Sequence, residues 1–100
     1  MTITSLQIYT GDPNRVEEGI ALAAKAKKMA IAHGADDMRM GQIQTGQYTG
    51  HWLIATFFAN MEAFGKAVDA MSQDPAFMAL AAEAPGKLVS RTLIRGADIG

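Results

Sequence analysis

The chain has 100 residues, 49% of them hydrophobic and 19% charged, so it is long enough for one domain, residues 1–100, and too short for a second domain with its own core. Nine basic and ten acidic residues give a net charge of −1, which argues against a nucleic-acid partner because such proteins present a basic face. The sequence has no cysteine, two histidines and no apolar run long enough to span a bilayer, so we expect no disulfide, metal site, other cofactor or membrane partner, and we predict a cytoplasmic protein.

The first half of the chain predicts a strand followed by a long helix. The strand covers residues 3–10 and ends at a turn. Asp12 is a favourable N-cap, and Pro13 suits the first helical position, where its missing N–H is no loss. The predicted helix covers residues 13–33 and ends at Gly34, because glycine accepts the backbone conformation of a helix C-terminus.

The rest of the chain predicts three more strands, a second helix and one further helical piece. Polar side chains on both faces of its first strand are typical of a sheet edge. Asn60 and the Asp74-Pro75 pair are helix-start signals, and Pro85-Gly86 is a stop signal. In chain order, we expect a strand at 38–45, a hairpin loop at 46–50, a strand at 51–59, a helix at 60–72, a helical piece at 75–84 and a last strand at 87–95.

The element order β-α-β-β-α-β defines the expected fold. Each β-α-β unit crosses over with a right-handed connection, which places both main helices on the same face of the sheet. The sequence therefore predicts an α+β protein of the ferredoxin-like type, with a four-stranded, mostly antiparallel sheet and two main helices on one face.

The strand at 51–59 is apolar on both faces, although one chain's helices can cover only one of them. Leu53 and Phe57 would lose roughly 1.5–3 kcal/mol of burial each if they faced water. A second copy packed sheet to sheet would cover them, so we predict a homodimer with both residues at its interface. A loop folded over the sheet is the alternative. Gln7 and Tyr9 are expected to make polar contacts at the same interface, with a ligand role as the less favoured interpretation.

The opposite face of that strand points toward the helices and suggests a ligand pocket. An indole offers flat apolar contact and one donor, so Trp52 would suit an apolar or aromatic ligand, with Thr56 and Phe64 beside it. His51 would lie at the pocket mouth, where it could move a proton. The alternatives are a tryptophan that fills the core and a histidine that is solvated.

Arg91 and Arg95 fall on one face of the last strand. They could bind an anion, because guanidinium groups match carboxylates. The favoured alternative is that basic side chains on an edge strand prevent pairing with other molecules.

Two segments carry a resemblance to a known superfamily. The run from Thr56 to Phe64 (TFFANMEAF) and the turn from Ser72 to Phe77 (SQDPAF) resemble the strand-to-helix passage and the terminal helical piece of dimeric α/β-barrel proteins, similar to the antibiotic-biosynthesis-monooxygenase-like members. The resemblance implies two sheets that form a barrel across a dimer, and a substrate between the sheet and the helices of one subunit. The resemblance does not extend to the haem-degrading members, which have a haem-ligating histidine on the second helix, because residues 60–84 contain no histidine. No catalytic motif of the family matches this sequence, so the catalytic residues stay unknown.

Two classes of function remain open. One is an enzyme similar to the monooxygenase-like members, which oxygenates or isomerises a small aromatic or polyketide-like substrate without a cofactor. The other is a non-catalytic ligand-binding or stress-related dimer. A pocket of at least roughly 300 Å³ with Trp52 in its wall would favour the enzyme, and a closed core would favour the second class.

Overall fold

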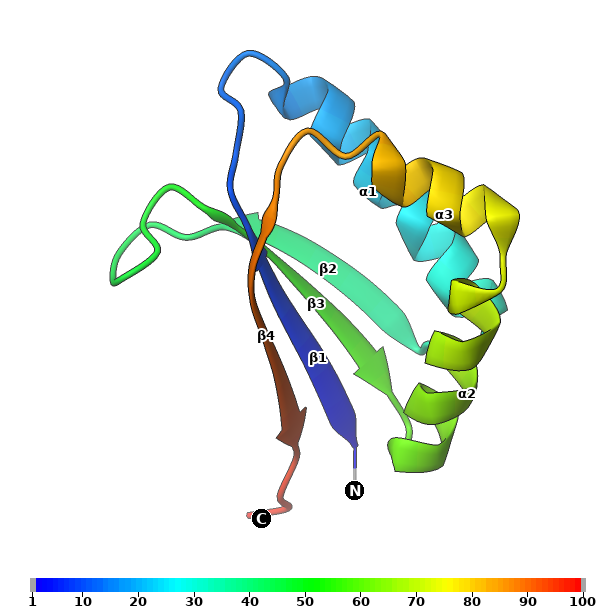
Figure 1. Cartoon of the computed structure of the whole chain (residues 1–100). Coiled ribbons are helices and arrows are strands. Elements are labelled where there is room, and N and C mark those ends of the chain that lie inside the picture. The colour runs from blue at the N-terminus through cyan, green and yellow to red at the C-terminus, as the bar shows by residue number, and fades with distance from the viewer. Residues whose placement is uncertain (1, 100) are drawn as a thin grey trace.

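A single sheet with helices on one side forms the whole fold in the computed structural model, which describes residues 2–99 (Figure 1). The four strands are all paired antiparallel in the order β2-β3-β1-β4, so β2 lies at an edge as its polar pattern predicted. The ferredoxin-like α+β fold is therefore confirmed. In chain order the elements are β1 (Ile3–Tyr9), α1 (Val16–Ala32), β2 (Asp37–Gln42), β3 (Trp52–Phe58), α2 (Met61–Ser72), α3 (Pro75–Ala82) and β4 (Leu88–Arg95).

The start of α1 differs from the predicted start at Pro13. The Arg15 N–H donates to the Asp12 carbonyl at 2.9 Å, which closes a turn before the helix. The first helical bond runs from the Gly19 N–H to the Arg15 carbonyl, also at 2.9 Å. The Asp12 carboxylate accepts a bond from the Asn14 N–H at 3.0 Å and so stabilises the turn rather than capping α1.

The starts of α2 and α3 follow the predicted capping signals. The Asn60 side chain accepts a hydrogen bond from the Ala63 N–H at 2.8 Å, which satisfies one of the free donors at the start of α2. The Asp74 side chain does the same for Ala76 at 3.0 Å, and Pro75 occupies the first turn of α3. Short polar side chains before each helix therefore define both starts.

The pairing of β1 with β3 decides which side chains share a face. Tyr9 lies opposite Trp52 and Gln7 lies opposite Ile54, and all four side chains face the helices. The small core also lies on this side: Phe58 is 2% exposed, and its ring meets that of Phe64 edge to face at 5.2 Å. The other buried apolar residues are Ile3, Ala30, Ala35 and Ala67.

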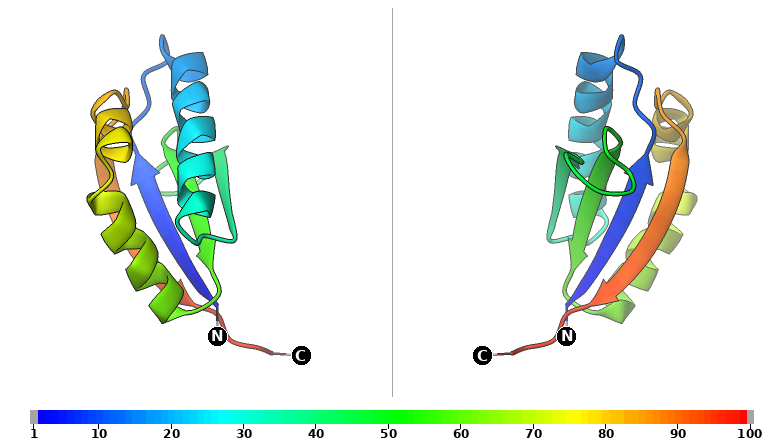
Figure 2. Two further views of the ribbon diagram at one scale, coloured as in Figure 1. Left: turned by 90° about the vertical axis from the view of Figure 1, so that its right-hand side faces the viewer. Right: turned by 90° about the vertical axis from the view of Figure 1, so that its left-hand side faces the viewer.

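The second face of the sheet is open. Leu53 pairs with Ile8 and Phe57 pairs with Thr4, so these side chains point away from the helices, as the sequence predicted, and both Leu53 and Phe57 are half-buried. Figure 2 shows all helices on one side of the sheet and none across this open face. None of the helices within residues 2–99 is both long and apolar enough to cross a bilayer.

Candidate functional site: a pocket between sheet and helices

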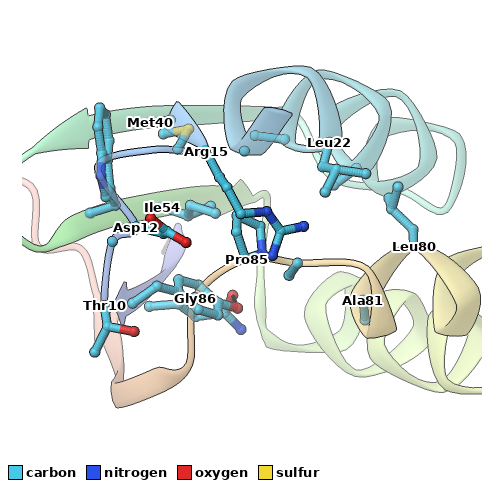
Figure 3. A pocket seen from close by; sticks show the side chains of 18 of the residues that line it. Thr10, Asp12, Arg15, Leu22, Met40, Ile54, Leu80, Ala81, Pro85 and Gly86 are labelled. Carbon is cyan, nitrogen blue, oxygen red and sulfur yellow. Dashed lines mark hydrogen bonds between the residues drawn. The ribbon is translucent and has the colours of Figure 1, made fainter. Parts of the chain in front are cut away.

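A pocket of about 170 Å³ lies between α1, α3 and the sheet (Figure 3). It is smaller than the roughly 300 Å³ expected for a drug-sized ligand. It is close to the roughly 150 Å³ cavity that holds one benzene molecule in a well-studied engineered core. The pocket therefore matches one aromatic ring.

The walls of the pocket are mostly apolar. Leu22 of α1 and Leu80 of α3 line the pocket from the helices, and Met40 and Ile54 line it from the sheet (Figure 3). Ala26 lines it one helical turn beyond Leu22. The alanine on α1 leaves space that a larger side chain would fill. Such a cavity favours a ligand with a flat apolar body.

Trp52 lines the pocket and lies beside the chain that leaves β1. A Cβ atom on Gly11 would lie 2.8 Å from the Trp52 Nε1 atom, closer than real Cβ contacts. Gly11 therefore allows the indole to lie against the backbone. Within residues 2–99 the indole N–H has no hydrogen-bond acceptor, so it remains free to bond a ligand.

The rim opposite α1 is formed where the chain enters β4. Thr10 and Lys87 bond twice: the Thr10 N–H donates to the Lys87 carbonyl, and the Lys87 N–H donates to Thr10 Oγ1, both at 2.9 Å. Gly86 lies directly against Thr10, and a Cβ atom there would lie 2.0 Å from the Thr10 carbonyl oxygen. Only a residue without a side chain fits this rim.

Two polar side chains of β1 interrupt the apolar lining. The Tyr9 hydroxyl donates a hydrogen bond to Gln7 Oε1 at 2.8 Å. Burial raises the pKa of Tyr9 above its usual value, although the positive charge of Arg91 acts in the opposite direction. Tyr9 therefore keeps its proton near neutral pH and holds the Gln7 side chain in one orientation.

Asp12 and Arg15 lie at the pocket mouth. Arg15 is held by Glu18, because its Nε donates to Glu18 Oε2 at 2.8 Å. Asp12 is the one carboxylate among the described residues that line the pocket. It is the lining group best suited to accept a proton from a bound molecule.

The residues that the sequence proposed for a ligand site are only partly gathered here. Trp52 lines the pocket, whereas Thr56 is buried under the helices and Phe64 packs against the core ring of Phe58. The ring of His51 lies 5.7 Å from that of Tyr48, tilted by 57°, and is not part of the pocket lining.

The placement of Gln7 and Tyr9 corrects a second expectation. Both side chains line the pocket on the helix side, while Leu53 and Phe57 lie on the open face. Gln7 and Tyr9 share a face with their partners on β3, Ile54 and Trp52. Successive residues of β3 point to opposite faces, so Leu53 and Phe57 are on the other face and cannot share one sheet-to-sheet interface with Gln7 and Tyr9. The less favoured interpretation, a position facing a ligand, is the one that matches their location.

The sequence also missed the contribution of α3 and the segment after it. Phe77, Leu80 and Pro85 line the pocket, although no periodic pattern marked them as site residues. The Pro85-Gly86 pair was recognised only as a helix stop. Its second role, the close approach to Thr10, depends on a contact between residues far apart in the chain.

A hydrogen bond joins the end of α1 to the start of α3, the two helices that line the pocket. His33 Nε2 lies 3.0 Å from Asp74 Oδ2. This bond, followed by the N–H groups of Ala76 and Phe77, holds the pKa of Asp74 below its usual value. The ionised form of Asp74 is therefore favoured by folding.

Asp74→Asn should lower the Tm at pH 7, because asparagine retains the helix cap but loses the charge beside His33. A lowered pKa gives stability that is present above the pKa of the unfolded chain and is lost as the pH falls through the pKa of the folded state. The difference in Tm between wild type and variant should therefore shrink below about pH 4 and vanish at still lower pH. Thermal unfolding from pH 7 to pH 2 measures it. Asp69→Asn on α2 is the matched control, and an equal, pH-dependent effect there would contradict the role of the His33 bond.

Within residues 2–99, no three acidic, histidine or cysteine side chains come together as a set of metal ligands. The pocket accordingly offers hydrogen bonds, one carboxylate and an apolar surface to a ligand.

Comparison with known proteins places the fold. Residues 3–96 match the protein family described as "Domain of unknown function (DUF6854)". No curated protein matches the sequence.

Solved structures that are similar to this chain have the same ferredoxin-like architecture. An uncharacterized NIPSNAP domain protein from Burkholderia xenovorans matches with a TM-score of 0.75 and 12% identity, over 98% of this chain and 97% of that one. SnoaB, a cofactor-independent oxygenase from Streptomyces nogalater, matches with a TM-score of 0.70 and 14% identity, over 97% and 94% of the two chains. Rv0793 from Mycobacterium tuberculosis matches with a TM-score of 0.66 and 11% identity, over 98% and 97%. These neighbours support the ferredoxin-like fold that the sequence predicted.

Proposed function

The chain belongs to the family described as a domain of unknown function, DUF6854, and from its pocket we propose that it binds a small aromatic molecule and converts it without a cofactor. The observation that carries the proposal is the cavity of about 170 Å³ with Trp52 in its wall. The cavity is smaller than the minimum of roughly 300 Å³ expected for a larger substrate. We therefore propose a substrate with a single aromatic ring and not a polyketide-like molecule. The likeness to a cofactor-independent oxygenase supports the same class of reaction.

The proposed chemistry makes few demands on the protein. A substrate with an acidic methylene between a ring and a carbonyl loses a proton to a carboxylate, for which Asp12 is placed at the pocket mouth. Molecular oxygen then oxidises the carbanion: the methylene becomes a carbonyl with one oxygen atom, and the second atom leaves as water with the two hydrogens. Isomerisation needs only the return of the proton to another carbon.

Filling the pocket tests this proposal. Ala26→Phe places a phenyl ring in the space that a ligand ring would take, since a cavity of roughly 150 Å³ holds only one benzene. The affinity for benzyl alcohol, measured by calorimetry, should fall about tenfold or more. The matched control is Ala21→Phe, which puts the same ring on the exposed side of α1 and should leave binding unchanged. Equal binding by all three proteins would contradict a ligand site in this pocket.

Oxygen uptake separates the enzyme from a non-catalytic binding protein. Phenylacetone carries one ring and an acidic methylene, and we expect the wild type to consume oxygen in its presence while Ala26→Phe does not. Binding of phenylacetone without oxygen uptake or isomerisation would favour the second candidate, a non-catalytic ligand-binding dimer. That candidate is supported by the scarcity of titratable groups in the lining.

We also propose that the working form is a cytoplasmic homodimer of one-domain chains, residues 1–100. The open, half-buried apolar face with Leu53 and Phe57 supports this assembly. The ligand pocket lies on the other face of the same sheet, so each subunit would keep its own site.

A further inference from the structure

The pocket has one polar end, formed by Gln7 and Tyr9 of β1, and the exposed Arg91 of β4 lies beside this end, outside the lining. Arg91 lies directly opposite Gln7 in the β1–β4 pairing, so both side chains are on the helix side of the sheet. Its positive charge acts on the Tyr9 hydroxyl. The remaining walls are mostly apolar, and the charged groups of the lining, Asp12 and Arg15, lie at the mouth.

The hydrogen bonds within the polar end determine what it can offer to a ligand. The Tyr9 hydroxyl donates its proton to Gln7 Oε1, so the oxygen of the Gln7 amide is occupied. The amide N–H₂ group of Gln7 remains available, and it can only donate. A ligand atom beside it must therefore be an acceptor.

Arg91 adds a positive charge without a compensating partner. Within residues 2–99, no carboxylate pairs with its guanidinium group. A guanidinium group presents a planar set of donors that matches the two oxygens of a carboxylate. An unpaired cation on β4 thus lies beside the donor amide of Gln7, which lines a cavity that fits one ring.

We propose that the ligand is a one-ring aromatic acid, with its carboxylate at the polar end and its ring against Trp52 and Ile54. This inference rests on the proposed ligand pocket and adds the charge and orientation of the molecule. Gln7 and Arg91 are then the residues that determine specificity. A neutral compound of the same shape leaves Arg91 without a partner and binds more weakly.

Binding of benzoate and of benzyl alcohol tests the charge. Trp52 is the single tryptophan of the chain and lines the pocket, so its fluorescence reports both titrations. We expect the wild type to bind benzoate at least tenfold more tightly than benzyl alcohol. Arg91→Gln should weaken benzoate binding about five- to tenfold and leave benzyl alcohol binding unchanged. Gln7→Glu replaces the donor amide by a carboxylate and should weaken benzoate binding at least as much.

The matched control for charge is Arg95→Gln. Arg95 lies on the same face of β4 but pairs with Ile3, four residue pairs further along the strands than the Gln7–Arg91 pair, so the substitution should not change benzoate binding. Equal affinity of the wild type for the two compounds, or equal losses for Arg91→Gln and Arg95→Gln, would overturn the aromatic-acid assignment and leave the pocket proposal standing. Failure of both compounds to bind would overturn both proposals.

Discussion

Replacing Gly86 by alanine is expected to destabilise the protein strongly and to deform the pocket rim. The added Cβ atom would lie 2.0 Å from the carbonyl oxygen of Thr10, and this contact involves backbone that cannot rotate away. The two hydrogen bonds between Thr10 and Lys87 must then lengthen. Overpacking of this kind costs about 2–3 kcal/mol of unfolding free energy, which lowers the Tm of a domain of this size by roughly 10–20 °C. Thermal and urea unfolding measure the loss.

Gly65→Ala provides the matched control, because Gly65 lies in the middle of α2 and a Cβ atom there meets nothing within 4 Å. Alanine has the better helix propensity, so this variant should be more stable than the wild type by about 0.5–1 kcal/mol. The same chemical change is thus predicted to have opposite signs at the two sites. A neutral effect of Gly86→Ala would show that the chain entering β4 is free to move away from β1.

Placing aspartates at Leu53 and Phe57 is expected to abolish the proposed dimer. Each apolar side chain contributes roughly 1.5–3 kcal/mol when it is fully covered. The dimer contains four of these side chains, and each is already half-buried in the single chain, so their loss removes about 3–6 kcal/mol from association. That loss raises the Kd of the dimer by about two to four orders of magnitude. Light scattering at micromolar concentration should report twice the chain mass for the wild type and one chain mass for the double variant.

A charge on the helix side serves as the control for this experiment. Met78 is 58% exposed and belongs to α3, a helix on the other side of the sheet from the open face, so Met78→Asp should leave the mass unchanged. Circular dichroism should show that both variants remain folded. A wild type that is monomeric at micromolar concentration, or a double variant that stays dimeric, would refute sheet-to-sheet association.

The agreement between sequence and structure is greatest where local signals act alone. Asn60 and Asp74 cap their helices through hydrogen bonds to residues two or three positions later, so a few consecutive residues are enough to predict both caps. Asp12 carries the same signal but is used in a turn, and α1 begins at Val16. An aspartate side chain can accept a hydrogen bond either from a turn N–H or from the first N–H groups of a helix. Both bonds are local, and residue type alone does not decide between them.

The ligand site was less predictable because it depends on which residues meet across the fold. The alternation of β3 correctly separated Trp52 from Leu53, since successive residues of a strand point to opposite faces. The sequence predicts Gln7 and Tyr9 at the dimer interface, because the polarity of these residues does not show which face of the sheet the helices cover. The sequence predicts Thr56 and Phe64 beside Trp52 in the pocket, but both belong to the core, where Phe64 meets Phe58.

The sequence by itself determined the element order, the edge position of β2, two helix caps and the apolar character of both faces of β3, because propensity, capping and periodicity act over a few neighbouring residues. Only the tertiary structure decided where the cavity lies and what lines it. The Tyr9–Gln7 bond faces α1 and α3, Gly86 packs on Thr10, and His33 reaches Asp74, 41 positions away. Such contacts arise from how the layers pack, and no local pattern encodes the shape of the space left between them.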